Sequence, residues 1–250
     1  MKKIFISVLA LGVILATPSC DVLQDTASAV VNTTPNNGGD EKKSLTNQEV
    51  ISGLKEALTV GIRNAVDVTS VTDGFLGNQE IKLPFPESAN NMREKALEWG
   101  LEGQVNKITE TLNRAAEDAA KEATPIFVNA IKNMSVNDGF KILNDGNGAA
   151  TDFLKRNTQS QLVTAFSPKV QESIERVKLT EYWEPVMTRY NQAVRFTGGE
   201  QVDTDLNQYV TTKAIDGLFI MVEKEENKIR LDPAARVTDL LSRVFGSLGN

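Results

Sequence analysis

Apolar residues recur at the spacing of an α-helix in one segment after another beyond Leu45, and this pattern most narrows the possible folds. Thr46 and Glu49 open the first of these segments with the spacing of a capping box. Because residues three and four apart share one face of a helix, each segment presents an apolar face for burial. About 200 such residues can enclose one sizeable core. We therefore predict an all-α fold, a single domain of eight or nine helices over residues 45–246.

Capping residues and prolines predict where several of these helices begin. Ser135 and Asp205 are good N-cap residues ahead of apolar, helically spaced segments. Ser167 precedes a proline, so it is predicted to end one helix and to open the next. Asp232 also precedes a proline and is predicted to begin a last helix that runs to about Phe245.

A long, Ala-rich helical segment is predicted from Val105 to Ala130, and Pro125 should kink or divide it. Glu117 falls on the polar face of this segment by its spacing. Pro185 should disturb another helix in the same way. The span from Gly217 to Val222 is apolar all round, so we expect it to be the most buried part of the domain.

Within the predicted helical domain, Val71 to Pro86 is the one long stretch that lacks a helical pattern. Its Asp-Gly and Gly-Asn pairs favour turns, and its two prolines oppose a helix. Its large apolar residues are Phe75, Leu76, Ile81, Leu83 and Phe85. A solvated loop would not carry so many, so we predict an extended strap or a small hairpin packed on the helices. Asp73, Asn78 and Glu80 in the strap should form turns or face a ligand.

The amino-terminal residues have the layout of a secretory signal peptide, with two lysines, an apolar run and small residues before Cys20. This arrangement resembles a bacterial lipobox, which implies that residues 1–19 are removed and that Cys20 carries acyl chains. The alternative is an ordinary secretory signal with a chance cysteine. Residues 20–44 are rich in Asn, Thr, Gly, Asp and Ser and are predicted to be a flexible tether.

The composition excludes several kinds of chemistry. The chain has no His and one Cys, so it has no Ser-His-Asp triad, no imidazole metal site and no internal disulfide. Its formal net charge of −6 makes it a poor ligand for nucleic acid. We predict no cofactor and no bound metal.

Three segments resemble an uncharacterised bacterial family of envelope proteins, domain of unknown function (DUF) 4197. They are Asp73 to Glu87, Asn113 to Ile131 and Val210 to Gly246. The resemblance covers Leu45 to Gly246 and leaves residues 247–250 as a short tail. It implies a helical domain in envelope proteins that are often lipoproteins. It implies no catalytic residues, because none are established for the family.

The best candidate for catalysis is a charged cluster near the carboxyl end. Its members are Glu223, Glu226, Arg230, Asp232, Arg236 and Asp239. Paired carboxylates beside arginines could hydrolyse a glycan by acid-base catalysis. The structural alternative, which we favour, is a surface ion pair between Glu226 and Arg230, with Arg236 paired to Asp232 or Asp239.

Taken together, the sequence predicts a lipid-anchored protein of the cell envelope, attached to the outer membrane of a Gram-negative bacterium. We expect a non-catalytic binding or scaffold module with an envelope protein as partner. Its candidate ligand or partner surface consists of Asp73, Asn78, Glu80, Glu226, Arg230, Arg236 and Asp239. The alternatives are a helical carrier of a small amphiphile such as a lipid, and a carboxylate hydrolase of envelope glycan.

Overall fold

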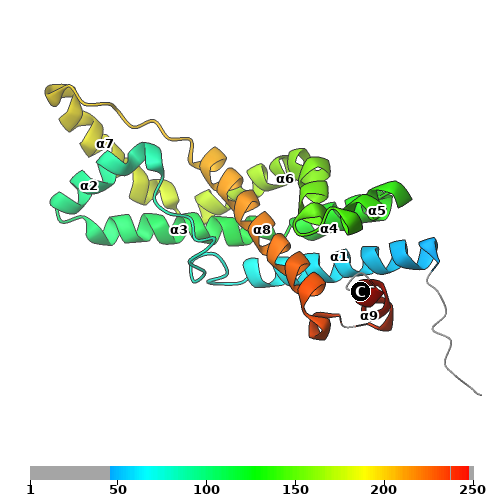
Figure 1. The fold of residues 1–250 in the computed structure, drawn as a ribbon. Helices are drawn as coiled ribbons and strands as arrows, with labels where there is room; N and C mark the ends of the chain where they lie inside the picture. The colour runs from blue at the N-terminus through cyan, green and yellow to red at the C-terminus, as the bar shows by residue number, and fades with distance from the viewer. Residues whose placement is uncertain (1–45, 237, 248–250) are drawn as a thin grey trace, which may run out of the picture. The chain divides into compact units, whose positions relative to one another are not determined.

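The structure is a computed structural model that describes residues 46–236 and 238–247. Within these ranges the chain forms nine α-helices and two 3₁₀ turns, with no β-strand (Figure 1), which confirms the predicted all-α class. The α-helices are α1 (Asn47–Thr69), α2 (Asn90–Glu98), α3 (Glu102–Ala120), α4 (Ala123–Asn133), α5 (Val136–Asn144), α6 (Ala149–Arg176), α7 (Leu179–Thr197), α8 (Leu206–Leu231) and α9 (Asp239–Ser247). The 3₁₀ turns are η1 (Glu87–Ala89) and η2 (Pro233–Ala235). The predicted signal peptide, Cys20 and the tether lie outside the described residues.

Three helices begin at the N-caps that the sequence predicts. At the start of α1, the amide of Thr46 donates to Glu49 Oε2 at 2.8 Å, and the amide of Glu49 donates to Thr46 Oγ1 at 3.2 Å. Ser135 and Asp138 form the same reciprocal box at α5, with both bonds at 3.1 Å. Asp205 Oδ1 accepts the amide three residues on at 2.9 Å and caps α8. These caps satisfy amides that the first turn of a helix leaves unpaired.

The capping box at the start of α5 should contribute to the stability of the fold in a pH-dependent way. The hydroxyl and the amide of Ser135 donate to the Asp138 carboxylate, and these bonds lower the pKa of Asp138 from its ordinary value. The box therefore stabilises the fold above the ordinary carboxyl pKa and loses that contribution as the pH falls through the lowered, folded-state value. In Ser135→Ala we expect the pKa of Asp138 to rise toward normal in an NMR titration of its carboxyl carbon. An unchanged pKa would contradict this explanation.

The helices pack in two groups that share α3 and α6 (Figure 1). In one group α1 contacts α4, α5 and α9, and in the other α2 contacts α7. Helix α3 contacts α1, α2 and α7, while α6 contacts α4, α5 and α7, and α8 lies against α1, α3 and α6. One continuous cluster of buried apolar side chains runs through both groups, from Leu54 on α1 to Trp183 on α7. Residues 46–247 as described therefore share a single core.

Pro125 divides the long Ala-rich segment, as the sequence predicts. Helix α3 ends at Ala120, and α4 begins at Ala123, so that Pro125 lies in the first turn of α4. A proline is tolerated in that turn because its missing amide would have no partner there. The last alanines of α3 are fully buried, which lets neighbouring helices approach its backbone closely.

The other two helical prolines do not end their helices, so the predicted break at Pro168 is wrong. Helix α6 continues through Pro168 and α7 through Pro185. Each proline removes the hydrogen bond to the carbonyl four residues earlier, at Thr164 and Glu181. Both prolines and both of these residues are exposed, so water can satisfy the carbonyls. Buried apolar residues on either side hold each helix to the core, and this burial offsets the cost of the proline.

Ser167 is therefore not an N-cap. Its hydroxyl donates to Asn207 Oδ1 at 2.8 Å, and its carbonyl accepts from Asn207 Nδ2 at 2.8 Å. The residue joins α6 to the start of α8 instead of opening a new helix.

The last predicted helix is also divided. Asp232 Oδ1 accepts the amide two residues on at 2.9 Å and caps only the short turn η2, while α9 begins at Asp239. Arg236 lies between them and turns back, donating to the carbonyls of Ile229 at 3.2 Å and Arg230 at 2.8 Å. Arg236 thus satisfies the carboxyl end of α8, and its predicted ion pair with Asp232 or Asp239 does not form.

The middle of α8 is buried on three sides only. Leu218, Phe219 and Val222 are buried as predicted, but Ile220 is 40% exposed. The prediction was wrong for Ile220 because α1, α3 and α6 leave one side of α8 uncovered. Gly217 has a separate role, since a Cβ there would lie 2.7 Å from a ring carbon of Phe75 in the strap. The missing side chain lets the strap approach α8.

Candidate functional site

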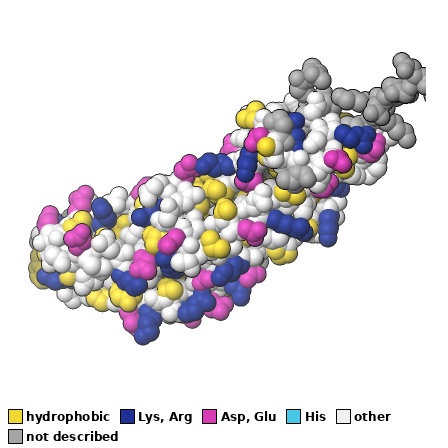
Figure 2. All heavy atoms as spheres, turned by 90° about the horizontal axis from the view of Figure 1, so that it is seen from below, with side chains coloured by type: hydrophobic (Ala, Val, Ile, Leu, Met, Phe, Trp, Pro, Cys, Tyr) yellow, Lys and Arg dark blue, Asp and Glu magenta, His cyan; other side chains and the backbone are white. Residues whose placement is uncertain are grey.

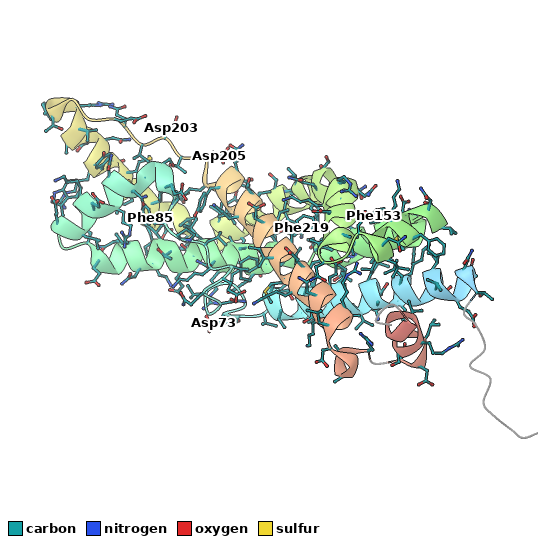
Figure 3. The ribbon with its side chains drawn as sticks, viewed as in Figure 1. Asp73, Phe85, Phe153, Asp203, Asp205 and Phe219 are labelled. Carbon is teal, nitrogen blue, oxygen red and sulfur yellow. The ribbon has the colours of Figure 1, made fainter. Side chains whose placement is uncertain are left out.

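Residues 71–86, the strap, form a series of turns followed by a short extended stretch. They contain no strand, so the extended-strap prediction is confirmed and the hairpin alternative is wrong. Four of the apolar side chains are buried as expected: Phe75, Ile81, Leu83 and Phe85. Phe85 (Figure 3) stacks on Trp183 of α7 with ring centroids 5.5 Å apart. The strap is therefore part of the packed core rather than a loop over it.

A buried amide on α3 holds the extended end of the strap. Asn113 has no exposed surface. Its Oδ1 accepts the amide of Leu83 at 2.8 Å, and its Nδ2 donates to the carbonyl of Leu83 at 2.9 Å and to that of Thr109 at 2.8 Å. One side chain thus serves both backbone groups of Leu83, as a neighbouring strand would.

A buried carboxylate one turn further along α3 holds the other end of the strap. Glu117 Oε1 accepts the amides of Phe75 and Leu76, both at 3.2 Å. Arg114 donates to Glu117 Oε2 at 2.8 Å and to Asp73 Oδ1 at 2.8 Å, and the bond to Glu117 raises the pKa of Arg114. The sequence prediction put Glu117 on the polar face of α3, which is wrong, because the strap covers that carboxylate.

The predicted ligand-facing residues of the strap all have partners within the fold. Asp73 (Figure 3) has a φ of 66° and its carboxylate pairs with Arg114. Asn78 accepts the amide of Glu80 at 3.1 Å, and its Nδ2 lies 3.6 Å from Met221 Sδ on α8. Glu80 forms an ion pair with Lys224. Asn78 thus forms a turn with Glu80, and the carboxylates of Asp73 and Glu80 pair with cations of α3 and α8.

Tyr209 on α8 fixes the strap near its last prolines. Its hydroxyl donates to the carbonyl of Pro84 at 2.8 Å. Burial raises the pKa of Tyr209 to about 12, so the phenol stays protonated and can keep donating this bond even above the ordinary tyrosine pKa. The strap is thus bonded to α3 on one side and to α8 on the other.

An open groove of about 590 Å³ lies between the strap, α2 and α3. The residues that line it include Leu76, Lys82, Pro84, Asn90, Arg93 and Asn106. Within the described part of the chain, neither Lys82 nor Arg93 forms an ion pair, whereas Glu110, which also lines the groove, pairs with Lys107 at 2.9 Å. The groove therefore combines two available cations with amide side chains and apolar walls.

Glu226 and Arg230 form the predicted i,i+4 pair, but the pair is buried rather than on the surface. Glu226 is 6% exposed. Its carboxylate accepts the amides of Ala150 at 3.0 Å and Thr151 at 2.9 Å and the hydroxyl of Thr151 at 2.8 Å. Arg230 donates to Glu226 Oε1 at 2.8 Å and to the carbonyl of Ile142 at 2.8 Å. Glu226 therefore caps α6 from another helix, while Arg230 reaches the end of α5.

The cavity beside this pair is small. It has a volume of about 20 Å³ and is lined mainly by apolar residues of α1, α6 and α8, together with Glu226 and Arg230. That is room for about one water molecule. A pocket for a small-molecule ligand is typically ~300–1,000 Å³.

The remaining members of the charged cluster do not complete a catalytic site. Asp239 is exposed at the start of α9, and Arg236 is bonded to backbone carbonyls. The oxygens of Glu226 are occupied by an arginine, two amides and a hydroxyl. Among the described residues, no three Asp, Glu, Cys or His side chains gather where they could hold a metal ion.

Sequence reasoning missed Asn113, which holds the strap, and the two cations that line the groove. The available signal for Asn113 was its spacing, because it lies four residues before Glu117 with the buried Ala115 and Ala116 of α3 between them. Lys82 and Arg93 carry no such signal, because only the folded strap brings them to one groove.

Comparisons with known proteins agree with the sequence resemblance. A family model described as "Protein of unknown function (DUF4197)" matches residues 44–246. No curated protein and no solved structure matches the chain. Among the described residues, no helix is long and apolar enough to cross a membrane. Because the family model covers the whole helical domain, the chain belongs to the DUF4197 family.

Proposed function

We propose that this protein is a lipid-anchored component of the cell envelope whose helical domain is a binding or scaffold module. In this proposal Cys20 carries acyl chains that retain the protein in the outer membrane of a Gram-negative bacterium. The groove beside the strap is the surface that receives a protein partner. The observation that carries the binding role is this groove, because buried hydrogen bonds fix one of its walls.

The sequence before the domain supports the anchoring part of the proposal. The chain's only cysteine follows the apolar run and small residues that precede a lipobox cleavage site. Each buried methylene of an acyl chain contributes about 0.8 kcal/mol, and stable retention takes more than one chain. The net charge of −6 would not hold the protein to anionic lipids, so acylation has to supply the attachment.

The state of the buried carboxylates favours binding over catalysis. A general acid or base needs an oxygen that can reach a substrate. Glu226 and Glu117 are 6% and 4% exposed, and each is bonded to an arginine and to backbone amides. These bonds give both residues a structural role. The hydrolase alternative depends on Glu226, so it then lacks a carboxylate that could act on a substrate. The cavity of about 20 Å³ is too small for an amphiphile, and the larger groove beside the strap is open and lined by charged and amide side chains as well as apolar ones.

Photo-crosslinking in whole cells tests the proposed function. Asn106 is exposed on the rim of the groove and can be replaced by a photoreactive amino acid. We expect a covalent product with one envelope protein and expect the Cys20→Ala form, which is no longer retained in the membrane fraction, to lose it. Gln159 on α6 is exposed and does not line the groove, so it is the matched control position. Equal products from both positions, or none from Asn106, would contradict the binding role.

A further inference from the structure

We propose that the groove beside the strap binds a short acidic peptide segment of the partner through Lys82 and Arg93. This inference rests on the proposed function, because it names the chemistry of the partner at the same groove. Lys82 comes from the strap and Arg93 from α2, and both line the groove. Because each wall of the groove contributes one cation, the groove favours an anionic ligand.

The two cations are available because the fold does not use them. Other charged residues of the strap and its surroundings are paired: Arg114 with Glu117 and Asp73, and Lys224 with Glu80. Within residues 46–236 and 238–247, Lys82 and Arg93 have no carboxylate partner. A carboxylate entering the groove would gain charge-assisted hydrogen bonds without breaking an existing ion pair.

The other residues of the groove suit a peptide. Asn90 and Asn106 are exposed amides that can both donate and accept, as the backbone of an extended peptide requires. Leu76 and Pro84 supply apolar contacts between the polar groups. A groove of about 590 Å³ lies within the range of pockets for small ligands, so it accommodates only a short segment.

One wall of the groove is already ordered before binding. Asn113 bonds both backbone groups of Leu83, and Tyr209 bonds the carbonyl of Pro84. These contacts hold the strap directly after Lys82, and the amide of Lys82 itself donates to the carbonyl of Asn78 at 2.8 Å. A preformed wall reduces the conformational entropy that a ligand must overcome on binding.

The charge of the rest of the molecule limits the ligand to a short acidic segment. The chain is net negative, and Figure 2 shows Lys and Arg interspersed with Asp and Glu over the face in view, rather than a continuous basic surface. A long polyanion would meet these carboxylates, whereas a short segment meets mainly the groove. At physiological salt the screening length is about 8 Å, so the nearest charges dominate.

The test combines the crosslink from Asn106 with charge reversal in the full-length protein in cells. Lys82→Glu with Arg93→Glu should reduce the crosslinked product about tenfold, since two ion pairs become two repulsions. Lys132→Glu with Arg195→Glu makes the same change in net charge at two exposed cations that do not line the groove and should leave the product unchanged. Mass spectrometry of the product should place the crosslink within a partner segment that has at least two Asp or Glu side by side or one residue apart.

A direct binding measurement identifies the ligand chemistry. The probe is a fluorescent pentapeptide with two glutamates, and its counterpart has glutamines at the same positions. We expect the glutamate peptide to bind the purified full chain about tenfold more tightly than the glutamine peptide, and the Lys82→Glu, Arg93→Glu protein to lose this preference.

Two failures can be told apart. If Asn106 gives no crosslinked protein, the proposed function fails and this inference fails with it. If the crosslink forms but survives charge reversal, or maps to a segment without acidic residues, only the acidic-peptide inference is overturned. A glutamine peptide that binds as tightly as the glutamate peptide also overturns it.

Discussion

Replacing Glu226 with Ala should lower the free energy of unfolding by about 3–5 kcal/mol, the largest effect that we expect of any single substitution. The change leaves the Arg230 guanidinium, whose side chain is 10% exposed, without its carboxylate. It also leaves the amides of Ala150 and Thr151 without their acceptor at the start of α6. The loss combines an uncompensated buried charge with unpaired backbone groups. Urea denaturation of the purified full chain measures it.

Glu223 provides the matched control on the same helix. It is exposed, so Glu223→Ala should change stability by less than about 0.5 kcal/mol. Arg230→Met removes the guanidinium charge that Glu226→Ala leaves without a partner. The double variant should therefore lose less free energy of unfolding than the sum of the two single variants. A Glu226→Ala protein within about 1 kcal/mol of the native chain would show that this capping arrangement is energetically unimportant. Because we expect Glu226→Ala to lower stability, a loss of hydrolase activity in that variant would indicate catalysis only if its folded state were shown to be intact.

Replacing Asn113 with Leu should lower the free energy of unfolding by about 2–5 kcal/mol and should loosen the strap. Leucine has nearly the same shape but cannot pair with the amide and carbonyl of Leu83, which is 1% exposed. Two buried backbone groups lose their partners, and each unsatisfied group costs about 1–3 kcal/mol. Hydrogen exchange at the Leu83 amide should accelerate more than exchange in α1, because the strap opens before the whole domain does.

Asn106→Leu is the control for the Asn113 substitution. It makes the same chemical change on the same helix at an exposed position, and it should alter stability by no more than about 0.5 kcal/mol. If Asn113→Leu protects the Leu83 amide as well as the native chain does, Asn113 does not hold the strap. Asn113→Leu should also weaken binding of the glutamate peptide, because it loosens the strap that forms one wall of the groove.

Local sequence signals predicted the helix starts well and the helix interruptions less well. The caps at Thr46, Ser135 and Asp205 depend only on residues within one turn, so the sequence contains all the information needed. The effect of a proline depends on what surrounds it. Pro168 costs one hydrogen bond on an exposed side of α6, and burial of the neighbouring apolar residues outweighs that loss.

The candidate site was harder to predict because its residues act across long sequence separations. Glu226 was correctly paired with Arg230 from their spacing, yet the pairing rule does not say whether the pair is buried. Its capping of Ala150 and Thr151 joins residues more than seventy positions apart. Lys82 and Arg93 were not singled out at all, since exposed cations are common and only a shared groove distinguishes them.

The sequence by itself determined the all-α class, the position of the strap and the family, and it predicts lipidation at Cys20. The fold class and the strap follow from apolar periodicity and turn residues, the family from the resemblance of three segments, and the lipidation prediction from one short local pattern; none of these needs a distant partner. Only the tertiary structure decided that Glu117 and Glu226 are buried and bonded and that a groove forms beside the strap. Burial of a charged side chain depends on which helix packs over it, and residues far along the chain determine that packing.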